Sequence, residues 1–128
     1  QNFGSSRQFS VGYIYTGNTM TIAWGIVITE GNTVTVRSTE VSSSGSGMVT
    51  IPFAAPFVLT ANTLYDIWVC GKSANYFSCY HFATPSSLVA LMCQADTTAT
   101  TVTTWADYNP QLSSSLVSIT AVPWIRLN

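Results

Sequence analysis

Apolar and polar residues alternate with a period of two along much of this chain. In the segments 8–15 and 19–28, every second residue is apolar or aromatic. The residues that share a face are Phe9, Val11, Tyr13 and Tyr15 in the first segment, and Met20, Ile22, Trp24, Ile26 and Ile28 in the second. Because successive side chains of a strand point to opposite faces, both segments are predicted to be β-strands.

Turn signals separate the first strands. Gly17-Asn18 and Gly31-Asn32 each lie between two alternating segments. Glycine and asparagine tolerate the positive φ that two-residue hairpin turns require, so the first third of the chain is predicted to be an antiparallel meander. The stretch Ser42–Gly47 consists of serine and glycine and is predicted to be a surface loop.

Strand signals continue to the C-terminus, and no segment has a capped helical pattern. The further predicted strands are 33–41, 48–53, 57–60, 64–71, 76–82, 88–94, 100–105 and 116–127. About nine or ten short strands in one small chain are typical of a two-sheet sandwich, a jelly roll or a small barrel. We therefore expect an all-β fold, an antiparallel two-sheet β-sandwich that is jelly-roll-like, with residues 1–128 forming one domain.

The composition argues against nucleic acid and membranes as binding partners. The chain is 47% hydrophobic and 7% charged, with a net charge of -1, which excludes a disordered protein and leaves no basic surface for nucleic acid or anionic lipid. The longest apolar stretch, Ile51–Leu59, contains two prolines and is too short to span a bilayer as a helix, so no membrane insertion is expected.

Hydroxyl side chains stand where lysine and glutamate usually keep a small monomer soluble, as in the threonine-rich segment 97–104. Two explanations fit this neutral surface. Either identical subunits bury part of it, or the protein works outside cells. Both disfavour a cytosolic enzyme.

The chain begins Gln1-Asn2-Phe3, which suggests a processed mature protein or a fragment of a longer chain. Its three cysteines, Cys70, Cys79 and Cys93, are too few for a disulfide scaffold and leave the redox compartment open. Together with one histidine they lack the paired spacing of a structural zinc site, so neither a metal nor a cofactor is expected.

Catalytic patterns are scarce. His81 is the only histidine, and the serine-rich stretch 43–47 lacks the Gly-x-Ser-x-Gly pattern of a nucleophile elbow. Most of the five acidic residues adjoin turns or loops, where short acidic side chains commonly bond to the local backbone. We therefore expect a protein that is not an enzyme.

One predicted hairpin carries a candidate binding site. If 64–71 pairs with 76–82, Trp68 faces His81, Cys70 faces Cys79, and Asp66 lies one pair further along. An aromatic plate beside a carboxylate and an imidazole suits stacking on a sugar and hydrogen bonding to its hydroxyls. Packing at a subunit interface explains Trp68 and His81 equally well. A Cys70–Cys79 disulfide requires this register.

A second candidate site lies between the last two predicted strands. Trp105, Asp107, Tyr108 and Asn109 occupy a short segment that ends at Pro110 and is predicted to be a loop. Such a loop suits neutral glycan binding. The alternative is a tryptophan packed under the sheet edge, with Asp107 capping a turn.

The segment 52–69, in which Leu-Thr-Ala precedes a turn and Thr-x-Tyr opens the next strand, resembles extracellular β-sandwich modules. With the threonine-rich strands and the terminal Pro-Trp-Ile-Arg-Leu, the chain also resembles the distal head domains of bacteriophage tail fibres and similar viral spikes. The viral resemblance implies a homotrimer that binds a host-surface glycan or glycoprotein.

Three functions follow as expectations. The first is a non-enzymatic receptor-binding head on a fibre, located on the virion surface or otherwise extracellular. The second is a carbohydrate-binding module or lectin of a secreted protein. The third is a structural fibre or shell subunit without a ligand.

Overall fold

The structure is a computed structural model that describes residues 4–16, 21–72, 81–82, 92–93, 105–107, 117–118, 122–123 and 125–128. Within these ranges the chain forms antiparallel β-strands and one short 3-10 helix, and it contains no α-helix. The elements are β1 (Arg7–Thr16), β2 (Thr21–Glu30), β3 (Thr33–Arg37), β4 (Val41–Ser44), β5 (Gly47–Leu59), β6 (Asp66–Lys72), β7 (His81–Phe82), β8 (Met92–Cys93), η1 (Trp105–Asp107), β9 (Val117–Ser118), β10 (Val122–Pro123) and β11 (Ile125–Leu127). The all-β prediction is confirmed.

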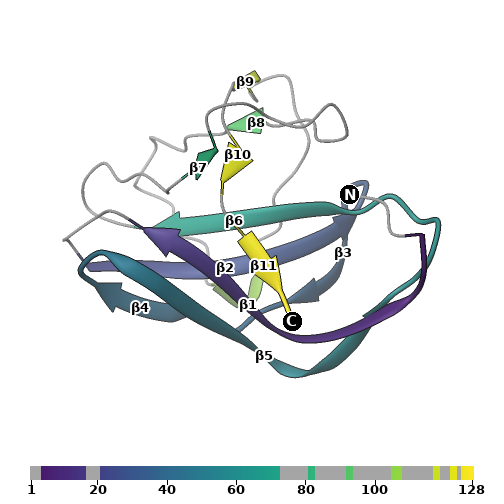
Figure 1. Cartoon of the computed structure of the whole chain (residues 1–128), viewed down its shortest axis with the longest axis horizontal. Coiled ribbons are helices and arrows are strands. Elements are labelled where there is room, and N and C mark those ends of the chain that lie inside the picture. The colour runs from purple at the N-terminus through teal and green to yellow at the C-terminus, as the bar shows by residue number, and fades with distance from the viewer. Residues whose placement is uncertain are drawn as a thin grey trace.

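Two larger antiparallel sheets organise the described strands (Figure 1). In the first, which we call the β1 sheet, β1 lies between β11 and β5. In the second, the β2 sheet, β6 pairs along one edge of β2 while β3 and β4 pair with successive parts of its other edge. Two short ladders, β7–β10 and β8–β9, complete the described strands.

One hydrophobic core receives side chains from both larger sheets. Its buried members are Phe9, Ile14, Ile22, Trp24, Ile26, Ile28, Val49, Ile51, Phe53, Leu59 and Tyr65. The alternating residues predicted to share a face in β2 from Ile22 to Ile28 are all part of this core, which confirms that prediction. Burial of these side chains supplies the main driving force for folding.

The alternation in β1 is broken by a β-bulge. The backbone N–H groups of Ser10 and Val11 both donate to the carbonyl of Asn128, at 2.8 and 3.1 Å. One extra residue reverses the faces of the residues that follow it. Phe9 is therefore in the core, whereas Tyr15 is 41% exposed. The prediction that these two residues share one face is wrong for this reason.

The Gly31-Asn32 turn forms as predicted, and it joins β2 to β3 with Gly31 at a φ of 58°. The turn predicted at 17–18 lies outside the described residues. Of Ser42–Gly47, predicted to be a loop, residues 42–44 instead belong to β4 and Gly47 begins β5. The edge of β2 from Thr21 to Trp24 offers hydrogen-bonding groups to these serines.

β5 is also longer and more continuous than predicted. The two strands expected at 48–53 and 57–60 form one strand, whose register against β1 shifts between the pairs of Phe9 and Val11. Of the strands predicted at 76–82, 88–94, 100–105 and 116–127, the described residues include only short parts.

Candidate functional site

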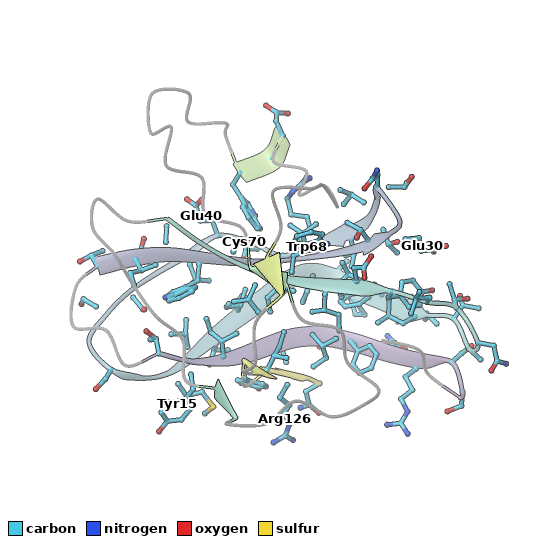
Figure 2. The ribbon with its side chains drawn as sticks, turned by 90° about the horizontal axis from the view of Figure 1, so that it is seen from above. Tyr15, Glu30, Glu40, Trp68, Cys70 and Arg126 are labelled. Carbon is cyan, nitrogen blue, oxygen red and sulfur yellow. The ribbon has the colours of Figure 1, made fainter. Side chains whose placement is uncertain are left out.

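The outer side of the β2 sheet carries two tryptophans, Trp68 and Trp105, that are predicted from the sequence to belong to binding sites. Ile67 and Val69 of β6 pack against the core, so strand alternation directs Asp66, Trp68 and Cys70 outward. The indole N–H of Trp68 donates to the Thr29 hydroxyl at 3.0 Å. Figure 2 shows Trp68 and Cys70 on this layer of the molecule.

Trp105 fastens η1 to the same side of the β2 sheet. Its ring lies directly against Gly25, in the space that a Cβ at that position would occupy. Its indole N–H donates to the Ser38 carbonyl at 2.7 Å, and the Arg37 guanidinium lies 5.9 Å from the ring centroid. The half-buried indole therefore packs over β2, the central strand of the sheet, and not under the sheet edge where the second interpretation of the 105–109 segment placed it.

Ser38 forms hydrogen bonds that differ from those of a regular ladder, and one of them binds this tryptophan. Its backbone N–H continues the ladder by donating to the Ile26 carbonyl at 2.9 Å. The Ile26 N–H donates to the Ser38 hydroxyl at 2.8 Å, while the Ser38 carbonyl accepts from Trp105. The side-chain oxygen thus satisfies a buried backbone donor and leaves the carbonyl available to the indole.

The pairs among the described residues do not include the predicted hairpin between 64–71 and 76–82, and residues 73–80 lie outside the described ranges. β6 pairs with β2, which sets Trp68 opposite Val27 and not opposite His81. β7 pairs with β10, which sets His81 opposite Pro123.

The predicted register between Cys70 and Cys79 involves a residue outside the described ranges. Cys70 stands opposite Gly25 and carries a free thiol. Cys79 lies outside the described residues, and of Cys93 only the backbone is described.

The candidate residues from the sequence are thus only partly brought together. Asp66, Trp68 and Trp105 share the outer side of the β2 sheet, with both indole N–H groups bonded within the chain. Asp107 is exposed on η1. Tyr108 and Asn109 lie outside the described residues, as does the side chain of His81.

Cys70 provides a chemical test of this packing. Burial raises the pKa of its thiol from 9.0 to about 12, and the nearby positive charge of Arg37 lowers it by a smaller amount. Because the thiolate is the reactive form, we expect iodoacetamide at pH 8 to alkylate Cys70 at least about a hundredfold more slowly in the folded protein than in guanidinium. Timed alkylation with peptide mass spectrometry measures this rate, and equal rates in both states would contradict the described burial.

The raised pKa of the Cys70 thiol also makes the free energy of unfolding depend on pH. Above pH 9 the unfolded chain releases this proton, whereas the folded chain retains it up to about pH 12. The contribution of Cys70 to the free energy of unfolding therefore falls as the pH rises through this window.

The outer side of the β1 sheet carries a further surface, which is not among the sites predicted from the sequence. Tyr13, Met48 and Arg126 line a shallow depression of about 220 Å³. Tyr15, opposite Met48 in the register, extends this surface. Figure 2 shows Tyr15 and Arg126 on the side away from Trp68 and Cys70. We call these four residues the tyrosine face. The alternation grouped the two tyrosines, but the bulge that turns them outward has no clear sequence signature.

Charge is distributed unequally between the two larger sheets. β1, β5 and β11 contain Arg7 and Arg126 and no acidic residue. The acidic residues within the described ranges, all outside the β1 sheet, are Glu30, Glu40, Asp66 and Asp107. The tyrosine face therefore lies on the sheet that carries only positive charge.

Comparison of the chain with protein-family models, with curated proteins and with solved structures gives no match. Across the described ranges, no group of three or more His, Cys, Asp or Glu side chains is arranged to hold a metal ion. None of the helical structure in those ranges has the length and apolar character needed to cross a membrane.

Proposed function

We propose that this chain is the non-enzymatic receptor-binding head of a viral or phage fibre, and that it recognises host-surface carbohydrate through the tyrosine face. The observation that carries this proposal is the exposure of Tyr15 and Met48, 41% and 58%, beside Tyr13 and Arg126 on one sheet surface. Exposed large side chains gathered on one face mark interaction sites.

The chemistry of the tyrosine face suits a sugar. Phenol rings offer flat apolar surfaces for the C–H face of a pyranose, and their hydroxyls can donate and accept hydrogen bonds. Arg126 adds donors at the edge of the depression. The depression, about 220 Å³, is smaller than the roughly 300–1,000 Å³ of sites that enclose a small molecule. This favours surface recognition of a glycan over enclosure of a substrate.

A jelly-roll-like β-sandwich is the architecture that we propose for this head. Its support is the core shared by the two larger sheets, and a chain that passes between those sheets at β1–β2, β4–β5 and β5–β6. The last of these connections is closed by Tyr65, whose hydroxyl accepts from the Thr60 N–H at 2.9 Å. A tyrosine that bonds to the backbone a few residues upstream is a feature of several β-sandwich domains.

Assembly as a homotrimer on the virion surface, or in another extracellular setting, completes the proposal. Outward positions of β3 and β4 carry exposed hydroxyls, including Thr33, Thr35, Ser42 and Ser44. A neutral surface of this kind can be buried between subunits without the desolvation cost of charged groups. The native mass of the protein, measured by sedimentation, tests this part of the proposal.

Removing a phenol ring tests the glycan site. Tyr13→Ala is expected to weaken glycan binding about threefold to tenfold, because aromatic contacts contribute about 0.5–1.5 kcal/mol beyond area burial. An array of host-surface oligosaccharides identifies binders, and biolayer interferometry then compares the variants. The matched control is Leu64→Ala, since Leu64 is 68% exposed in the β5–β6 connection and lies outside the tyrosine face.

The alternatives give different results in the same experiment. A folded trimer that binds no glycan would favour a structural fibre or shell subunit. A stable monomer that binds glycan would favour a carbohydrate-binding module or lectin of a secreted protein. Full affinity in Tyr13→Ala would remove the tyrosine face from the site.

A further inference from the structure

We infer that the tyrosine face selects carbohydrates that carry a carboxylate, such as uronic or sialic acids, over neutral sugars. This inference rests on the proposed function and specifies its ligand class. It is carried by the position of Arg126 in the depression beside Tyr13, on a sheet whose strands contain no acidic residue.

The strand register brings the required groups into one row. Tyr13 of β1 stands opposite Arg126 of β11 on one side and opposite Thr50 of β5 on the other. Side chains directly opposite each other in antiparallel strands have Cβ atoms about 4.5–5.5 Å apart. One sugar residue stacked on the Tyr13 ring could therefore reach the guanidinium and the threonine hydroxyl together.

A carboxylate matches Arg126 in shape as well as in charge. The guanidinium presents parallel N–H donors that can bind both oxygens of a carboxylate. Neutral hydroxyls would engage the same donors with weaker, uncharged acceptors. Arg126 therefore discriminates between a sugar acid and the corresponding neutral sugar, whereas the tyrosine rings bind the apolar surface of either.

Arg126 is available for such a ligand. Among the described residues, no carboxylate or other group forms an ion pair or hydrogen bond with its side chain. The described acidic residues lie on β2, on β6, on η1 and in the link between β3 and β4, none of which belongs to the β1 sheet. A bound carboxylate would thus meet a positive group without a neighbouring repulsive charge on that sheet.

Paired glycans test the inference. Each uronic- or sialic-acid oligosaccharide on the array is printed beside its carboxyl-reduced form, in which a primary alcohol replaces the carboxylate. We expect the native protein to bind the acidic member about tenfold more tightly. Arg126→Gln should abolish this preference, and it should weaken binding of the reduced member by much less than binding of the acidic member. Arg7→Gln is the matched control, because Arg7 is an exposed arginine at the start of β1 and lies outside the depression.

The outcomes separate this inference from the proposed function. Equal binding of acidic and reduced members, with both weakened by Tyr13→Ala, would overturn the carboxylate selection and leave glycan recognition intact. Preference for sulfated neutral glycans over carboxylated ones would also overturn it. Absence of glycan binding by the folded protein would overturn the proposed function itself. Loss of the acid preference in Arg126→Gln alone supports the inference.

Discussion

Replacing Trp105 with alanine is expected to lower the free energy of unfolding by about 2–4 kcal/mol and to leave the glycan affinity of the folded protein unchanged. The substitution removes a ring that lies against Gly25 and an indole donor 2.7 Å from the Ser38 carbonyl. Truncating fully buried tryptophans costs about 3–5 kcal/mol, and the half-buried state of Trp105 places it lower. Urea denaturation measures the stability, and biolayer interferometry measures the binding.

Phenylalanine at the same position separates the two contributions of Trp105. Trp105→Phe retains an aromatic ring over Gly25 and near Arg37, but it leaves the Ser38 carbonyl without its indole donor. We expect a loss of about 1 kcal/mol, the usual net contribution of one hydrogen bond. Unchanged stability in Trp105→Ala, together with lost glycan binding, would instead support the site predicted from the sequence at Trp105, Asp107, Tyr108 and Asn109.

The fold class and the β2 strand could be predicted from the sequence because their signals are local. In β2, four alternating large side chains from Ile22 to Ile28 define the buried face, and Gly31-Asn32 specifies the hairpin that follows. These features depend only on neighbouring residues. The fold class follows from many such strands in succession.

The tryptophan contacts could not be predicted because they join distant parts of the chain. The Trp105 indole bonds to a carbonyl 67 residues earlier, and the Trp68 indole bonds to a hydroxyl 39 residues earlier. Composition and spacing show that aromatic and polar groups are present, but not which side of a sheet receives them. Gly25 leaves space for the Trp105 ring, and this role cannot be inferred until the position of the ring is known.

The tyrosine face could not be predicted because a single β-bulge in β1 determines which residues of this strand point outward. The bulge at Ser10 and Val11 depends on the carbonyl of Asn128, at the other end of the sequence. Without the bulge, regular alternation keeps Tyr15 on the same face as the buried Phe9. A prediction of the tyrosine face from this strand alone therefore lacks the contact that orients it.

Adding a methyl group at Gly12 is expected to lower the free energy of unfolding by about 1–3 kcal/mol. A Cβ on Gly12 would overlap the Cδ1 atom of Ile26, and Ile26 is fully buried on the opposing sheet. Ile26→Val removes that same Cδ1 atom and by itself should cost about 0.5–1.5 kcal/mol. Chemical denaturation of Gly12→Ala, Ile26→Val and the double variant gives a complete double-mutant cycle.

The double variant tests how the two sheets face each other. If Gly12 and Ile26 meet across the core, the alanine methyl occupies the space vacated by Cδ1, and the double variant should be more stable than the sum of the two losses predicts. Strict additivity would show that these positions are not in contact, and it would contradict the face-to-face packing behind the proposed sandwich. The same result would question the outward direction of Tyr13, because residues 12 and 13 point to opposite sides of β1.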